Sequence, residues 1–204
     1  MKRGANQLPR GKHGLPNEYV VQHQRRRILD AVGEMLVEVG YGALTVELIR
    51  EQAEVSRRTY YDHFADKEAG VVAYFDTVTT ALLAAIDASL ANKETGSDGG
   101  LDRVLTIILR LVAEHPVPAQ VWLLTLGRSC ERLSDRRDLA MAQLMQRVDR
   151  QLPAAGQPGG SPLAVEVTIG GVCELLRHRL RHGDRASDPA ARELVAVLLG
   201  SSRA

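Results

Sequence analysis

The sequence of 204 residues has little cysteine, few aromatic residues and almost no net charge. Its two cysteines, Cys130 and Cys173, are too few for a disulfide framework, and both lie in apolar segments that favour reduced, buried side chains. The formal net charge is +1, so any contact with a polyanion must depend on local positive charge. An apolar content of 45% and a charged content of 25% are ordinary for a globular protein, and the length allows a substantial core.

Targeting and membrane signals are also absent by inspection. The N-terminal segment MKRGANQLPRGKHG is basic and polar, without the apolar run of a signal sequence. No stretch approaches the ~20 uncharged apolar residues that span a bilayer. The sequence therefore predicts a cytoplasmic protein that does not contact a membrane.

Positive charge is concentrated at the N-terminus. Residues 1–27 carry seven basic residues against the single acid Glu18, a local charge of +6. We interpret residues 1–23 as a flexible basic arm, because glycine and proline are frequent there. Two interpretations stay open: a solvated terminus, or an arm that contacts phosphates or a minor groove.

Helical periodicity and breakers organise the rest of the chain, and strand signals are nearly absent. We expect an all-α fold of about nine helices, in which three short helices are followed by longer ones. Their expected ranges are residues 28–39, 46–53, 57–64, 67–91, 101–114, 117–130, 134–152, 163–181 and 189–200. We assign residues 24–68 to a helix-turn-helix DNA-binding domain and residues 69–204 to a larger helical domain for ligand binding and dimerisation.

The two short helices at 46–53 and 57–64 predict a helix-turn-helix unit. Thr45 and Ser56 are suitable N-caps for them, and Ser134 and Asp66 for later helices. A turn of about three residues around Glu54 joins the pair. Such a unit lays its second helix in a DNA major groove.

The second helix of this unit has two faces. On a helical wheel Tyr60 and Phe64 share one side, which suits packing on the domain core. Arg57, Arg58 and Tyr61 share another, where arginine can bind guanine or phosphate and a phenol can bind phosphate. The alternative is an ordinary solvated surface.

The segment from Arg27 to about Ala73 resembles the DNA-binding domain of the TetR family of transcriptional regulators. The resemblance lies in RILDAVGEMLVEVGYGALTVELIREQAEVSRRTYYDHFADKE, with a glycine-bearing turn, Thr before the second helix, and VS, T, YY, HF and KE at family spacing. It covers about a quarter of the chain. It implies DNA-binding roles for Thr45, Arg57, Arg58, Thr59, Tyr61, His63 and Lys67.

Three positions depart from the family pattern. Tyr60 stands where the family usually has an aliphatic residue, so its side is open: it packs inward, or its hydroxyl reaches the rim. Glu54 stands where glycine is common, and a positive φ there would cost on the order of 1 kcal/mol. Arg50 replaces a small residue and is either a phosphate contact or merely exposed.

The larger domain has no catalytic constellation, and we expect no enzymatic activity, cofactor or metal. His178 and His182 have a chelating spacing, but the arginines around them favour a basic solvated face. The resemblance implies an effector cavity, to which we assign Leu105, Ile108, Trp122, Leu126 and Met145. Few ionisable residues interrupt these helices, so we expect a largely apolar small-molecule ligand; a plain core is the alternative.

The helix at 163–181 is apolar around most of its circumference, which indicates burial on more than one side. The resemblance implies a homodimer interface, to which we assign Val167, Gly170, Gly171, Leu175, Leu194 and Leu198. The leading hypothesis is a homodimeric repressor released from a near-palindromic double-stranded DNA operator by its ligand. The rivals are a DNA-binding regulator without a small-molecule inducer, constitutive or controlled by a protein partner, and an enzyme that contains a helix-turn-helix.

Overall fold

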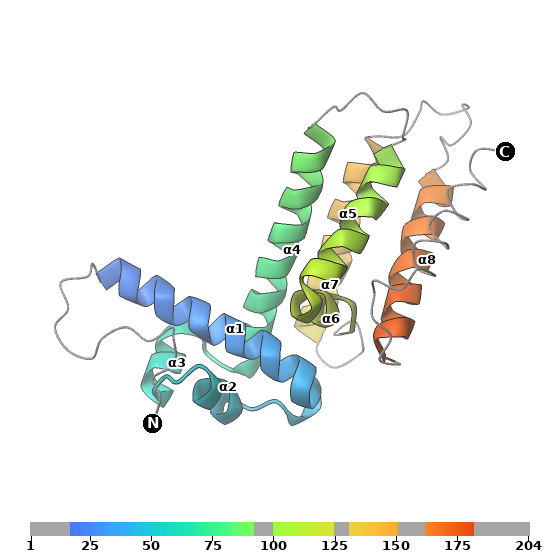
Figure 1. Ribbon diagram of the computed structural model, residues 1–204. Coiled ribbons are helices and arrows are strands. Elements are labelled where there is room, and N and C mark those ends of the chain that lie inside the picture. Colours follow the sequence, from blue (N-terminus) through green and yellow to red (C-terminus); the bar gives the residue numbers. More distant parts are fainter. Residues whose placement is uncertain (1–16, 92–99, 125–130, 151–161, 182–204) are drawn as a thin grey trace.

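A computed structural model describes residues 17–91, 100–124, 131–150 and 162–181. Within these residues the protein consists of eight helices and no strand, so the predicted all-α fold is confirmed (Figure 1). They are α1 Asn17–Ala43, α2 Val46–Gln52, α3 Arg57–His63, α4 Lys67–Ala91, α5 Gly100–Glu114, α6 Pro116–Leu124, α7 Glu131–Asp149 and α8 Pro162–Arg181. The helix expected at 189–200 lies outside the described residues.

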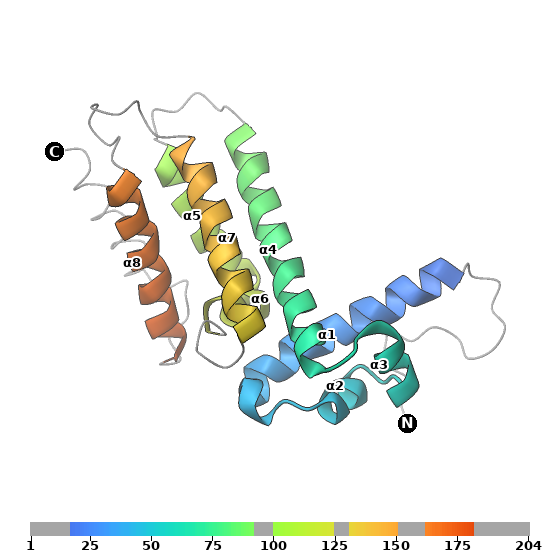
Figure 2. The same cartoon turned by 180° about the vertical axis from the view of Figure 1, so that it is seen from behind.

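The helices form two groups that share α4. At one end α1 packs against α2 and α3, and it also contacts α4 and α6. From there α4 runs into the second group, where it lies beside α5 and α7, with α8 on the far side of α7 (Figures 1 and 2). α1 thus lies across the base of α4 and connects the two groups.

The first helix is longer than the sequence indicated. It begins at Asn17, so residues 17–23, which we had assigned to the flexible arm, are helical; residues 1–16 lie outside the described range. The prediction was wrong because it relied on an apolar stripe that starts only at Ile28. The expected stop is confirmed: Gly40 has φ 74°, a left-handed conformation that L-residues rarely adopt and that interrupts the helix.

Side-chain caps set the starts of the next three helices as predicted. Thr45 Oγ1 accepts a hydrogen bond from the Leu48 amide at 3.2 Å at the start of α2. Ser56 Oγ accepts one from the Thr59 amide at 3.0 Å at the start of α3. Asp66 Oδ1 does the same for α4. These contacts satisfy amides that have no partner within the helix.

The boundaries in the larger group agree less well. α5 ends at Glu114 before Pro116, as expected, and α6 then leaves at an angle of 116° to α5. α6 is described to Leu124, and its expected continuation to residue 130 lies outside the described residues. α7 begins at Glu131, so the prediction of Ser134 as its N-cap was wrong: the serine already lies inside the first turn.

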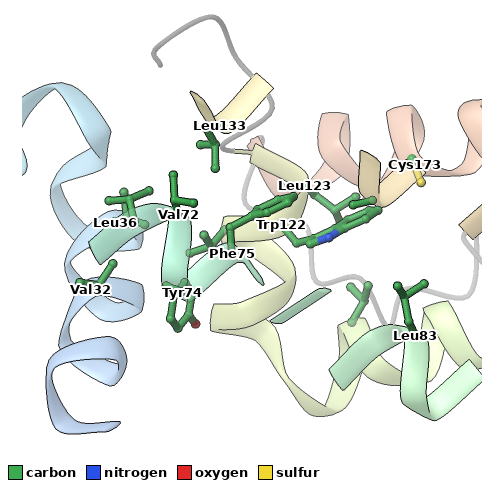
Figure 3. Packing of buried hydrophobic residues seen from close by; sticks show 14 of the residues in the cluster. Val32, Leu36, Val72, Tyr74, Phe75, Leu83, Trp122, Leu123, Leu133 and Cys173 are labelled. Carbon is green, nitrogen blue, oxygen red and sulfur yellow. The ribbon is translucent and has the colours of Figure 1, made fainter. Parts of the chain in front are cut away.

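α4 is the central helix of the core. By length and composition alone it could cross a membrane, contrary to our expectation that no stretch would, but it packs against α1, α5 and α7. Its Phe75 ring stacks on the Trp122 ring of α6 with centroids 6.3 Å apart. Trp122 Nε1 donates to Thr79 Oγ1 at 3.1 Å in the interior. Buried side chains continue from α1 through this pair to α8, so the groups share one core (Figure 3).

Candidate nucleic-acid interface and effector cavity

α3 has one buried and one exposed face. Tyr60 is fully buried and Phe64 nearly so. The Tyr60 hydroxyl donates to the Asp66 carbonyl oxygen at 3.0 Å, and burial raises the pKa of Tyr60 to about 12. The question left open for Tyr60 is therefore answered: the ring packs inward and its hydroxyl joins α3 to the start of α4.

The exposed face carries two cations and a phenol. Arg57 and Arg58 are exposed, and Tyr61 is 44% exposed. The Arg57 guanidinium lies 5.7 Å from the centroid of the Tyr61 ring. The Tyr60 ring meets the Tyr61 ring edge-on, with the two centroids 5.6 Å apart. These contacts hold Tyr61 in place while leaving its surface open to a ligand.

The hydroxyls of the two threonines assigned to DNA binding already form hydrogen bonds at the starts of α2 and α3. Thr45 Oγ1 accepts the Leu48 amide, and a hydroxyl that accepts one bond can still donate its own proton to a phosphate. Thr59 is half-buried, with its Oγ1 2.8 Å from Ser56 Oγ. Thr45 is therefore better placed for a phosphate contact than Thr59.

Lys67 has a structural contact in addition to its assigned role. Its Nζ donates to the Tyr41 carbonyl oxygen at 3.1 Å and lies 4.5 Å from the Tyr41 ring centroid. An ammonium group has three donors, so two remain for an anion. The contact fixes the start of α4 against the end of α1, next to the exposed face of the helix-turn-helix.

The turn between α2 and α3 is strained and clamped. Glu54 has φ 50°, which confirms the positive φ considered from the sequence. Arg27 of α1 donates to the carbonyl oxygens of Ala53 and Glu54, and pairs with the Glu54 carboxylate at 3.4 Å. Arg27 therefore stabilises the turn. From the sequence, Arg27 had been counted only as part of the local positive charge.

Arg50 is not a free cation. Its Nε donates to Glu47 at 2.7 Å, and its guanidinium also pairs with Glu51. The hydrogen bond from Arg50 is the main cause of the lowered pKa of Glu47. From the sequence, we considered a phosphate contact or mere exposure for Arg50, and neither includes this intrahelical ion pair.

Arg25 of α1 was missed as a candidate interface residue. Its guanidinium lies 4.6 Å from the Phe64 ring centroid, which brings an exposed cation beside α3. Burial, with the nearby Arg25 charge, lowers the pKa of the half-buried His63. His63 is thus favoured as a neutral hydrogen-bonding group, and Arg25 carries the charge. In the sequence, the only signal for Arg25 is the run Arg25 to Arg27, and this run does not show which of the three side chains faces α3.

A cavity of about 460 Å³ lies between α1, α4, α5 and α6. Its lining residues are Asp30, Tyr74, Thr77, Val78, Ala81, Leu82, Ile108, Leu111, Val112, His115, Pro118, Ala119, Trp122 and Leu123.

Two of the five residues assigned to the cavity, Ile108 and Trp122, line it. Leu105 is fully buried elsewhere in the core and Met145 lies on α7, so neither lines it, and Leu126 lies outside the described residues. The cavity takes its α5 lining from the second half of that helix, at Ile108, Leu111 and Val112.

α8 has an uncovered apolar face. Leu163 is 68% and Val167 66% exposed, while Val172 and Leu176 on the opposite face are buried. Gly170 and Gly171 lie near Val167 on the exposed side, with open space where a Cβ would stand. Leu175 is half-buried. The remaining residues assigned to the interface, Leu194 and Leu198, lie outside the described residues.

Comparison with known proteins agrees with this geometry. A sequence model described as "Bacterial regulatory proteins, tetR family" matches residues 28–73, the segment that contains α2 and α3. No curated protein sequence matches the chain.

Several solved structures share the fold over nearly the whole chain. The fatty acid degradation regulator FadR from Bacillus halodurans is 20% identical, with a TM-score of 0.74 over 87% of this chain and 95% of that one. FadR from Bacillus subtilis, solved with stearoyl-CoA, is 21% identical, with a TM-score of 0.71 over 85% and 97%. A TetR family regulator from Marinobacter aquaeolei is 22% identical, with a TM-score of 0.67 over 91% and 97%. At these identities the structures establish the fold alone. The chain therefore has the fold of these structures, and its residues 28–73 match the sequence model of the tetR family.

Proposed function

We propose that the protein is a cytoplasmic, homodimeric transcriptional repressor that a small, largely apolar ligand releases from a near-palindromic operator. The match of residues 28–73 to the tetR family model supports a DNA-binding transcriptional regulator. The observation that carries the proposal is the exposed face of α3, where Arg57, Arg58 and Tyr61 project from a helix anchored by buried Tyr60.

DNA binding divides among these residues by chemistry. Arg57 and Arg58 are suited to base edges in a major groove, since a guanidinium can donate two hydrogen bonds to guanine. Thr45, Tyr61 and Lys67 are suited to phosphate oxygens, which fix the position of the helix without reading sequence. Arg25 adds a cation on the α1 side of the same surface.

The uncovered stripe on α8 supports a homodimer. Leu163 and Val167 expose large apolar surface next to two glycines that allow a close backbone approach. A second copy of the same face would cover it symmetrically. Two recognition helices related in this way can reach half-sites about one DNA turn apart, ~34 Å, which requires a near-palindromic operator.

The cavity supports control by a ligand over control by a protein partner or constitutive binding. Its volume of about 460 Å³ is in the range of small-molecule sites. Because α1 supplies part of the wall, a ligand can bind two arrangements of α1 and α4 with different affinities and shift the population between them. The relative from Bacillus subtilis, solved with stearoyl-CoA, is a precedent for an effector in this fold.

Footprinting on the DNA upstream of the protein's own gene tests operator binding. The double variant Arg57→Ala, Tyr61→Ala should lose about ten- to a hundredfold in affinity, since a base-reading arginine alone is worth roughly 1–3 kcal/mol. The control Arg110→Ala changes an exposed arginine on α5, away from the helix-turn-helix. Normal protection by the first variant would exclude this face as the DNA contact.

Sedimentation of Val167→Asp tests the dimer. A carboxylate in the middle of an apolar interface has no partner and should yield monomers at concentrations where the unmodified protein is dimeric. Val21→Asp, at an exposed valine of α1, is the matched control. Dimers of unchanged stability in Val167→Asp would place the interface elsewhere.

A further inference from the structure

We propose that the cavity selects a ligand with an apolar body and a positively charged, amine-type end that binds Asp30 of α1. This inference rests on the ligand-responsive part of the proposed function and adds the chemical class of the effector. It also assigns the contact by which the ligand acts on the DNA-binding domain.

The apolar part of the site lies along α4 away from α1. From the α1 end, the residues of α4 that line the cavity are Tyr74 and Thr77, followed by Val78, Ala81 and Leu82. Their polarity therefore falls with distance from α1. The indole of Trp122 and side chains of α5 complete the apolar part. A ligand that fits this order has one polar end, directed toward α1.

The polar end of the cavity has an acidic side chain. Asp30 is the one acidic residue among the described lining residues, and its side chain is 56% exposed. Partial burial raises the pKa of Asp30 above its ordinary value; the nearby Arg26 charge opposes this rise and the Glu34 charge adds to it. A cation that binds Asp30 favours its carboxylate form. Burial raises the pKa of Tyr74 to about 12, and the charges of Asp30 and Glu34 add to that rise.

Inside the cavity only a histidine can offset the charge of Asp30. His115 is the one histidine among the described lining residues, and none of them is lysine or arginine. The nearest is Arg26, 3.8 Å from Asp30, but its side chain is 81% exposed and belongs to the outer surface. An anionic end, such as a carboxylate or a coenzyme A thioester, would bring negative charge next to Asp30. A protonated amine would instead form a charge-assisted hydrogen bond.

The same end of the site touches the joint between the two groups of helices. A Cβ at Gly33 would stand 2.4 Å from the Tyr74 ring, so α1 and α4 meet here without an intervening side chain. Asp30 lies nearly one turn before Gly33 on α1. A ligand that binds Asp30 and displaces Tyr74 therefore moves α1, the helix on which α2 and α3 pack.

Trp122 makes ligand binding directly measurable. It is the single tryptophan of the chain and lines the cavity, so its fluorescence reports on occupancy. Octylamine, octanol and octanoate have the same chain length and differ in end group. Titration of the full-length protein at pH 8, where histidine side chains add little positive charge, should give the order octylamine, octanol, octanoate. The amine should bind roughly fivefold more tightly than the alcohol, as expected for a partly exposed ion pair.

Asp30→Asn should remove the preference for the amine and leave octanol binding unchanged, while Asp30→Glu should retain it. The matched control is Asp76→Asn, which breaks a similar exposed pair, Arg136 with Asp76 at 3.7 Å, away from the cavity. The ratio of amine to alcohol affinity within each variant corrects for any loss of folding.

Two results would overturn the inference: octanoate binding as tightly as octylamine, or an amine preference that persists in Asp30→Asn. If octanoate binds and also releases the operator, the ligand class is wrong while the proposed function stands. If none of the three changes Trp122 fluorescence, the inference fails together with the ligand part of the proposed function. DNA binding, tested by the footprint of the free protein, would stand apart from both.

Discussion

The strained turn at Glu54 allows the cost of one backbone angle to be measured. An L-residue in the left-handed region carries about 1–2 kcal/mol of strain, and glycine carries none. Glycine also gives the unfolded chain more conformational freedom, and this reduces the stability gained from the relieved strain by about 0.4–1 kcal/mol. Glu54→Gly further loses the Arg27 ion pair at 3.4 Å, which at this exposure is worth about 0–1 kcal/mol.

Glu54→Ala isolates the angle, because it loses the same ion pair and keeps the positive φ. Glu54→Gly should therefore be about 1 kcal/mol more stable than Glu54→Ala. For a chain of this size the difference corresponds to roughly 2–4 °C in Tm. The assay is urea unfolding at one protein concentration, since the stability of a self-associating protein depends on concentration. An alanine variant more stable than the glycine variant by about 0.4–1 kcal/mol would show that the turn is not strained.

Three further predictions test other contacts. Gly33→Ala should destabilise the protein by roughly 1–3 kcal/mol in urea unfolding, because its Cβ would overlap the Tyr74 ring, whereas Gly42→Ala meets open space and should not. The tyrosine contribution to stability should be full below pH 10 and fall between pH 10 and 12, because burial raises the pKa of both Tyr60 and Tyr74 to about 12; Tyr60→Phe should remove about half of this fall in a denaturation profile. Arg25→Ala should weaken operator binding and lower the salt slope of the affinity by about one, and an unchanged slope would remove Arg25 from the interface.

Local chemistry explains what could be predicted from the sequence. The caps at Thr45 and Ser56 lie within three residues of the amides they bind, so a short window of sequence contains both partners. Inward packing of Tyr60 was one of two interpretations left open. The helical wheel favoured it because Phe64 lies four residues away on the same face of the helix. The start of α1 was missed because the apolar stripe used to predict this helix begins only at Ile28, whereas the first turns of α1 are mostly polar.

The cavity could be predicted only in part, because its lining depends on the angles between helices. Leu105 and Ile108 are three residues apart on one stripe of α5, yet only Ile108 lines the cavity. Leu105 is fully buried in another part of the core, and no periodicity encodes which neighbours each of these side chains meets. Asp30 was overlooked because it lies on α1, which the sequence assigned wholly to DNA binding.

The placement of Asp30 has a consequence for how such a protein can diversify. The segment of α1 before Gly40 both lines the cavity and packs against the helix-turn-helix. Under the proposed function, a substitution at Asp30 that admits a new effector also alters the helix that supports α2 and α3. Ligand specificity and operator affinity would then change together at Asp30, whereas at Leu82, farther along α4 from α1, they could change separately.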